Sequence, residues 1–326
     1  MRDPPVNVWP TETPMPSTRR TVLALISSAA GLAACDRSPV SGGDVLAAGQ
    51  PAALLVWAVA RERLLGWPRR PSPTMLAALP ALAATLPELG ALTTGGAPSN
   101  LEAMAALHPK LVIDYGNTGP EYRALSDRLR TRLGADWTLI DGALDSTAEA
   151  LIEAGHRLGA EARGRILSDM AAEVLRRWRQ APPGPAFYYA RGGDGLETAF
   201  AGALATEVLE GAGWTNLAIG SRDIGRVSRE QVATWDPEAV VTLSRPFATA
   251  AAADPLWRTR RDGSRRRLLL LPDTPFGWID RPPSVNRLLG CQWLADPSAD
   301  GTAASRLGQT LFGGPAAVAA RPEWIA

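Results

Sequence analysis

A short pattern occurs twice in this chain and limits its fold more than any other feature. Residues 101–114 and 229–242 each contain an amphipathic stretch, a Pro, and an aliphatic run that begins two residues after that Pro. In both copies a Glu precedes the Pro by seven residues. A short helix, a turn and a buried aliphatic strand form one unit of a parallel α/β sheet. The repeated unit therefore predicts two similar lobes.

The segment between the two copies predicts a helical link. From residue 145 to residue 179, apolar residues recur mostly four apart and charged residues separate them, as in a helix that buries one face. The predicted buried stripe consists of Leu151, Leu158, Ala162, Ile166, Met170, Val174 and Trp178. Gly159 predicts a break, after which a second helix of about 30 Å would extend from about residue 160 to about residue 180.

Both ends of this link carry recognisable signals. Asp145 or Ser146 could accept hydrogen bonds from the first free N–H groups, and Glu149 follows Ser146 at the spacing of a capping box. Pro182 and Pro183 prevent the helix from continuing.

Strands that alternate with helices predict an α/β fold with parallel sheets. The 326 residues allow two α/β domains of ordinary size. We expect a first lobe at 44–144, a linking helical region at 145–181 and a second lobe at 182–326. Ligands of such sheets bind outside the carboxyl ends of the strands.

The first 35 residues resemble a lipoprotein signal peptide. An uncharged apolar run at 21–34 is too short to be retained as a membrane span, and small residues lead into Cys35. This pattern predicts cleavage before Cys35, lipidation of its thiol, and a tether at 36–43. Met15 is an alternative start for the chain.

Two export routes remain open. Arg19 and Arg20 resemble a twin-arginine signal, whereas a basic region before an apolar run also fits Sec export. Asp36 resembles the residue that retains bacterial lipoproteins at the inner membrane. We therefore expect the protein in the periplasm, anchored to the inner membrane through Cys35.

Several functional classes are disfavoured. A net charge of +1 gives no reason to expect a nucleic-acid partner, and there is no Gly-x-Ser-x-Gly, Walker or dinucleotide-binding motif. The two His residues predict no metal site: His108 is interpreted as a turn residue, and His156 as solvent-facing. Cys291 is predicted to be a buried structural thiol, and the basic run at 258–267 a solvated loop.

The order of these features resembles a known family. It comprises the lipoprotein signal, Gly66-Trp67-Pro68-Arg69, a Gly-rich loop at 93–100, and the repeated unit on either side of a long helix. This order is similar to that of periplasmic binding proteins that serve importers of iron complexes and vitamin B12. Residues 188–197 and 277–286 are more similar to the iron-complex branch, and the resemblance covers residues 44 to about 295. It implies two Rossmann-like lobes joined by a single long helix, with the ligand between them.

The predicted loops at the strand ends contain aromatic and guanidinium side chains that suit a bulky, anionic, partly aromatic ligand. These residues are Trp67, Arg69, Tyr115, Tyr189, Arg191, Arg245, Trp278 and Arg281. The alternative is that each Arg pairs with a nearby acid such as Asp280 or Asp194, and that each Trp fills a core. Haem could also bind here, with Tyr115 or Tyr189 as its axial ligand.

The resemblance implies a monomeric, non-enzymatic lipoprotein that delivers a ferric siderophore to an ABC permease and its ATPase, with no covalent cofactor. Haem or cobalamin is the alternative ligand, and an exported sensor or enzyme on the same frame is the alternative class. Acidic residues of this family dock into the permease. Glu121 is one candidate, and Glu102 and Glu230 are the others, although carboxylates at a helix start also stabilise its dipole.

Overall fold

A computed structural model describes residues 42–93, 101–220, 223–297, 302–314 and 321–325. The predicted signal peptide, Cys35 and most of the tether lie outside the described residues, as does most of the Gly-rich loop before residue 101. Within the described ranges, no helix is both long and apolar enough to cross a membrane.

The first lobe contains a three-stranded parallel sheet in the order β1-β2-β3. Its strands are β1 (Val45–Ala47), β2 (Leu111–Gly116) and β3 (Asp136–Asp141). Its helical segments are α1 (Gln50–Ala60), η1 (Arg61–Arg63), α2 (Pro73–Ala77), α3 (Leu82–Thr85), α4 (Leu101–Ala105) and α5 (Pro120–Leu133). Residues 64–67 form only isolated bridges, from Leu64 to Val45 and from Trp67 to Glu88.

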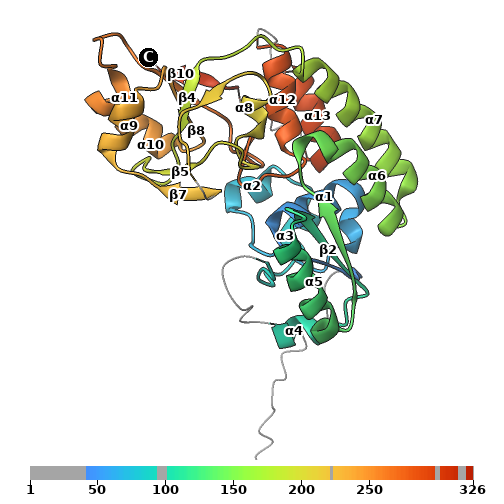
Figure 1. Cartoon of the computed structure of the whole chain (residues 1–326). Coiled ribbons are helices and arrows are strands. Elements are labelled where there is room, and N and C mark those ends of the chain that lie inside the picture. Colours follow the sequence, from blue (N-terminus) through green and yellow to red (C-terminus); the bar gives the residue numbers. More distant parts are fainter. Residues whose placement is uncertain (1–41, 94–100, 221–222, 298–301, 315–320, 326) are drawn as a thin grey trace, which may run out of the picture. The chain divides into compact units, whose positions relative to one another are not determined.

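The second lobe contains a five-stranded sheet in the order β10-β9-β8-β4-β6, of which only β10 is antiparallel (Figure 1). Its strands are β4 (Ala186–Tyr189), β6 (Thr215–Asn216), β8 (Ala239–Thr242), β9 (Arg267–Leu270) and β10 (Glu323–Ile325). A separate antiparallel pair is formed by β5 (Glu197–Ala199) and β7 (Ile224–Arg226). The predicted α/β class is confirmed, whereas β5, β7 and β10 were not predicted.

Six helices of the second lobe lie within the described residues. They are α8 (Glu207–Glu210), α9 (Arg229–Trp235), α10 (Arg245–Ala251), α11 (Pro255–Arg258), α12 (Arg287–Ala295) and α13 (Thr302–Phe312).

The repeated sequence unit has the same backbone path in both lobes. In each copy a residue with positive φ lies between a short helix (α4 or α9) and the Pro. φ is 48° at His108, which follows α4 after two turn residues, and 47° at Asp236, which directly follows α9. At the end of α9 the left-handed conformation terminates the helix, and in both copies the strand begins two residues after the Pro. His108 is therefore a turn residue, as predicted.

The link between the lobes consists of two helices that fold back on each other. These are α6 (Thr147–Arg157), which follows the short η2 (Leu144–Ser146), and α7 (Glu161–Trp178). Gly159, with φ of 62°, lies in the break, as predicted. Gly155 and Gly164 let the helices touch, because a Cβ added to Gly155 would lie 2.9 Å from the Cα of Gly164.

The predicted buried stripe of this link is only partly correct. Ala162 is exposed and Ile166 is 59% exposed. The residues of α7 that are buried are Gly164, Leu167, Ala171, Val174, Leu175 and Trp178. Steps of four residues drift by about 40° per turn of a helix with 3.6 residues per turn, so a long series of them leaves the buried face.

Two further local predictions are wrong. Ser146 makes no cap, because its hydroxyl donates to Oδ2 of Asp141 at 2.8 Å. The basic run at 258–267 is not wholly solvated: Arg266 is 2% exposed and its Nη2 lies 2.7 Å from Oδ1 of Asp236. A buried guanidinium requires such a partner.

A single hydrophobic cluster extends through both lobes and the link. Aromatic rings connect its parts, with centroid distances of 5.1 Å for Trp57–Trp67, 6.5 Å for Trp67–Phe276 and 5.2 Å for Phe276–Phe312. Two smaller clusters lie on the outer faces of the sheets, one beneath α4 and α5 and the other beneath α9–α11. The two lobes are therefore joined by packing as well as by the chain.

Candidate functional site

The loop between β9 and α12 connects the carboxyl edge of the second-lobe sheet to the first lobe. The hydroxyl of Ser284 donates to the carbonyl of Pro51, in the first turn of α1, at 2.7 Å. Phe276 from the same loop packs near Trp67 of the first lobe. This predicted ligand-binding loop therefore contacts the first lobe at α1 and at Trp67.

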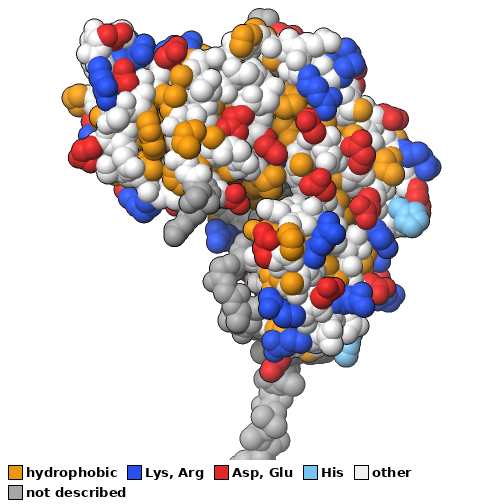
Figure 2. Space-filling model, viewed as in Figure 1, with side chains coloured by type: hydrophobic (Ala, Val, Ile, Leu, Met, Phe, Trp, Pro, Cys, Tyr) orange, Lys and Arg blue, Asp and Glu red, His pale blue; other side chains and the backbone are white. Residues whose placement is uncertain are grey.

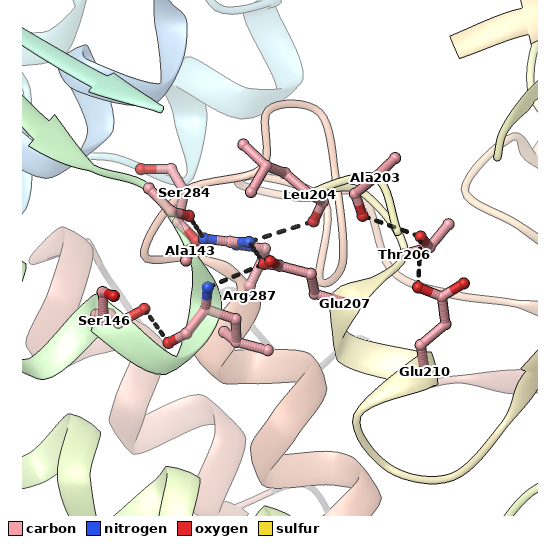
Figure 3. A network of polar contacts seen from close by, with 12 residues as sticks. Ala143, Ser146, Ala203, Leu204, Thr206, Glu207, Glu210, Ser284 and Arg287 are labelled. Carbon is pink, nitrogen blue, oxygen red and sulfur yellow. Dashed lines mark hydrogen bonds and ion pairs between the residues drawn. The ribbon is translucent and has the colours of Figure 1, made fainter. Parts of the chain in front are cut away.

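Beside this loop, an ion pair within the second lobe binds backbone groups of the first lobe (Figure 3). Arg287, which has no exposed surface, places Nη1 2.5 Å from Oε2 of Glu207, and its Nη2 donates to the carbonyl of Gly142 at 2.5 Å. Oε2 of Glu207 also accepts from the N–H of Leu144 at 2.9 Å. Burial raises the pKa of Glu207, whereas Arg287 lowers it. These contacts hold the end of β3 against the second lobe.

The sequence analysis did not identify this ion pair. Its only local signal is an Arg at the start of an otherwise apolar helix, since Leu288 and Leu289 follow Arg287 directly. A charged side chain on a buried helix must have a partner of opposite charge, but the sequence does not show which residue that partner is.

A second polar cluster lies after β4. The hydroxyl of Tyr189 donates to Oδ2 of Asp280 at 3.0 Å, and Nη1 of Arg191 lies 3.2 Å from the same oxygen. Nε of Arg191 lies 3.2 Å from Oε1 of Glu197. Both nitrogens of Arg191 are close enough for ion pairing but lack hydrogen-bonding geometry. Burial and the Asp280 carboxylate raise the pKa of Tyr189. Arg191 thus pairs with Asp280, as the alternative interpretation expected, whereas Asp194 pairs with Arg226.

Arg281 and Arg69 are the predicted site cations that retain free guanidinium groups. Neither group has a hydrogen bond or an ion pair within the described part of the chain. Arg281 is partly buried and close enough to Tyr189 for its charge to lower the pKa of that phenol. Arg69 is exposed, and its backbone N–H and C=O are each bonded to the side chain of Gln50 at 3.0 Å.

The end of β2 carries polar groups whose bonding is incomplete. Tyr115 is 2% exposed, and its hydroxyl has no hydrogen-bonding partner among the described residues. Asp114 points to the opposite face of the sheet from Tyr115 and is 7% exposed. Burial raises the pKa of its carboxyl group to about 6, although the hydrogen bond from the N–H of Tyr115 lowers this pKa.

Carboxylates from both lobes lie near Tyr122 of α5. Burial raises the pKa of Tyr122, and Asp223 of the second lobe raises it further, followed by Glu121 and Asp114. The sequence analysis named neither Tyr122 nor Asp223, because nothing local distinguishes them. Their proximity shows that α5 and the residues before β7 face the same space.

The two predicted Trp residues are enclosed. Trp67 has no exposed surface, and its Nε1 donates to the carbonyl of Ala83 at 3.0 Å. Trp278 is 1% exposed, and its Nε1 has no partner among the described residues. Both indoles pack in the core here, and ligand stacking by them stays a prediction.

Arg245 lies apart from the other predicted residues. Its exposed guanidinium is 3.0 Å from Oε2 of Glu323, in β10. It lines a hollow of about 270 Å³ at the β8–β10 edge, together with Leu271, Asp273 and Arg321. No described contact joins it to the cluster of Tyr189 and Asp280.

The three candidate docking carboxylates are all exposed and all lie in the first turns of helices. Glu102 is the second residue of α4, Glu121 of α5 and Glu230 of α9. The backbone N–H of Glu230 itself, followed by the side chain of Ser228, lowers the pKa of Glu230, so this carboxylate takes part in the start of α9. Permease docking by these residues stays a prediction.

The structure gives no support for metal or thiol chemistry in the part of the chain that it describes. No three His, Cys, Asp or Glu residues there are grouped so that they could hold a metal ion. Cys291 is fully buried, as predicted, and burial raises its pKa, so the reactive thiolate is disfavoured. His156 is exposed, as predicted.

Comparison with known proteins identifies the fold. No protein family and no curated protein matches the sequence. Among solved structures, a solute-binding protein of an ABC transporter from Sulfurospirillum deleyianum has a TM-score of 0.71 at 22% identity, covering 84% of this chain and 91% of its own.

Two further structures have lower scores. A periplasmic vitamin B12 binding protein of Vibrio cholerae has a TM-score of 0.59 at 20% identity, with 77% of this chain and 94% of that chain covered. A periplasmic haem-binding protein of Pseudomonas aeruginosa has a TM-score of 0.54 at 24% identity, with coverages of 78% and 93%. The chain therefore has the two-lobed fold of periplasmic binding proteins of ABC importers.

Proposed function

We propose that this chain is the substrate-binding protein of an ABC importer, and that it binds a small molecule between its lobes and delivers it to a permease. The observation that carries this proposal is the fold, which is shared over 84% of the chain with a solute-binding protein of an ABC transporter. A periplasmic location, with an inner-membrane anchor at Cys35, follows from the same proposal and from the signal-like sequence. Catalysis is not part of it, because the compared proteins are transport binding proteins.

The ligand that we propose is an iron complex, with a ferric siderophore as the first candidate. Arg281 and Arg69 support an anionic ligand, because their guanidinium groups have no partner among the described residues. Charged groups that are left unpaired beside a binding edge can hold carboxylates or other anionic oxygens.

Haem or cobalamin is the second candidate. Two of the compared proteins are named for vitamin B12 and for haem. The buried Tyr115 hydroxyl, which lacks a partner in the described structure, favours haem in particular, because a phenolate can act as an axial ligand of haem iron. An exported sensor that uses the same two lobes is the alternative outside transport.

Tryptophan fluorescence of the purified protein, titrated with ferric siderophores, haem and cobalamin, tests this assignment. We expect Arg281→Gln to weaken the binding of an anionic ligand by about 10- to 100-fold, because a hydrogen bond to a charged group contributes about 1.5–3 kcal/mol. Arg245→Gln is the matched control and should leave affinity unchanged, because no described contact joins that Arg to the cluster of Tyr189 and Asp280. If the wild-type protein binds none of these ligands, the iron-complex assignment is wrong. Equal affinities in wild type and Arg281→Gln would remove Arg281 from the site.

A further inference from the structure

A hollow of about 470 Å³ lies at the amino ends of β2 and β3, at the opposite end of the first-lobe sheet from the proposed ligand site. Its lining is rich in cations and consists of Arg63, Lys110, Leu111, Arg130, Asp136, Trp137, Thr138 and Arg157. A neighbouring hollow of about 590 Å³ shares Lys110, Arg130 and Asp136 with it. In Figure 2, Lys and Arg side chains gather on this part of the molecule, near α4 and α5.

Three of the four cations are available to an external anion. Arg63 is the exception, because its Nη2 lies 2.7 Å from Oδ1 of Asp44. Lys110 lies 3.5 Å from Oδ2 of Asp44 and is 79% exposed, and Arg157 lies 3.8 Å from Glu153 with both side chains about half exposed. Such exposed pairs are weak. Arg130 has no ion pair among the described residues.

Trp137, whose side chain lines the same hollow, carries an unpartnered donor. The indole Nε1 of Trp137 is buried and has no acceptor in the described structure. An indole N–H can only donate, and a buried donor without an acceptor destabilises the fold. An oxyanion in the hollow would supply that acceptor and would also meet the charges of Lys110, Arg130 and Arg157. Proteins bind phosphate oxygens through Arg and Lys side chains together with neutral N–H donors, and this hollow offers both.

The chain enters the first lobe at this same edge. The N–H of Asp44 donates to the carbonyl of Arg63 at 3.0 Å, and the N–H of Lys110 donates to the carbonyl of Asp44 at 2.9 Å. Cys35 precedes Asp44 by nine residues, and nine residues span at most about 30 Å. A lipid on Cys35 would therefore hold this edge within about 30 Å of the membrane surface, which presents the phosphates of phospholipid headgroups.

We propose that the basic hollow at the amino ends of β2 and β3 binds the phosphate groups of anionic phospholipids and so orients the tethered protein on the membrane. The inference rests on the proposed anchor at Cys35 for the identity of the phosphate source. Lys110, Arg130 and Arg157 provide the charge, and Trp137 donates to a phosphate oxygen. Because such contacts are screened by salt, the binding should weaken steeply as ionic strength rises.

Vesicle flotation tests the proposal. The protein used is the chain that starts at residue 35 and carries Cys35→Ser; it bears no lipid and retains the compact unit at 39–326. We expect binding to vesicles of phosphatidylglycerol and phosphatidylcholine, and none to phosphatidylcholine alone. The triple variant Lys110→Gln, Arg130→Gln, Arg157→Gln should bind about 100-fold more weakly, at roughly 5-fold per cation. The control is Arg165→Gln, Arg306→Gln, Arg321→Gln, which removes three exposed arginines that line neither hollow and should bind as the parent does.

Each other outcome is informative. Equal binding to both vesicle types, or unchanged binding by the triple variant, would overturn the proposal. Inorganic phosphate that binds and protects Trp137 from quenching, without any vesicle binding, would mean a site for free phosphate and would also overturn it. A further outcome is that the mass of the natural mature protein shows no lipid while the protein still binds only the vesicles that contain phosphatidylglycerol. In that case the predicted lipid anchor at Cys35 is wrong, and the site for phospholipid headgroups is supported.

Discussion

The two copies of the helix–turn–strand unit share a left-handed residue before the Pro and a buried strand after it, and they differ in how their polar groups are satisfied. In the second-lobe copy, Asp236 pairs with Arg266, and Ser228 and Gln231 form a capping box at the start of α9. Its strand ends at Thr242, whose Oγ1 accepts from the N–H of Ser244 at 3.0 Å.

The first-lobe copy ends differently. There the strand carries Asp114, with a pKa raised to about 6, and Tyr115, whose hydroxyl has no partner among the described residues. One copy thus uses its polar side chains to stabilise the fold, whereas the other keeps buried polar groups incompletely bonded at the edge where a ligand is expected. Functional sites commonly tolerate such a cost in stability.

The largest effect that we expect comes from removing the charge of Asp236. Asp236→Asn keeps a residue that tolerates positive φ but leaves the buried guanidinium of Arg266 without its counterion. Breaking a buried ion pair in this way costs about 3–5 kcal/mol, which chemical or thermal unfolding followed by circular dichroism would measure. His108→Asn, at the equivalent turn of the first lobe, should change stability by no more than about 0.5 kcal/mol. A similar loss in both variants would contradict the difference between the copies.

A pH-dependent effect should distinguish the two strand ends. The pKa of Asp114 is raised from 3.8 to about 6 in the folded protein, so its full contribution to stability is present below pH 4 and is lost as pH rises through 6. The loss amounts to about 3 kcal/mol at neutral pH. Asp114→Asn should remove it, so that the variant gains stability relative to wild type between pH 4 and pH 7 in urea unfolding. Thr242→Val, the matched change in the second lobe, should give a difference that does not vary with pH.

The smallest effect concerns two tyrosines. Tyr189→Phe should lose about 1.5–3 kcal/mol, because it removes a hydrogen bond to the Asp280 carboxylate. Tyr115→Phe should leave stability unchanged or raise it, since the lost hydroxyl has no partner in the described structure. Unfolding midpoints measured side by side would test this, and a larger loss for Tyr115→Phe than for Tyr189→Phe would show that the Tyr115 hydroxyl is bonded in solution.

The features that the sequence predicted well depend on residues close together in the chain. The turns before Pro109 and Pro237, the buried strands after them and the break at Gly159 all follow from local backbone preferences. The return of α7 onto α6 was missed because it depends on Gly155 and Gly164 meeting in space, and a single sequence does not show that glycines nine residues apart will touch.

The same distinction applies to the candidate site. The carboxyl ends of the strands were predictable as its location, because parallel sheets place those ends together. The partners of individual side chains were not, because Tyr189 and Asp280 are separated by 91 residues and Arg287 and Glu207 by 80. Only the folded chain shows that Arg191 is already paired while Arg281 is free among the described residues.

The contact between α1 and α13 has a consequence for how the protein is made. Nε1 of Trp57 and Nη1 of Arg61 both donate to the carbonyl of Phe312 at 3.0 Å, across 255 and 251 residues. Nine of the eleven residues of α1 are buried, and the part of this apolar helix that packs on α13 cannot be covered until those roughly 250 further residues have been synthesised. Contacts of such long range slow folding and leave apolar surface exposed to aggregation. The surface of α1 around Trp57 and Arg61 is therefore completed only after the second lobe has been made.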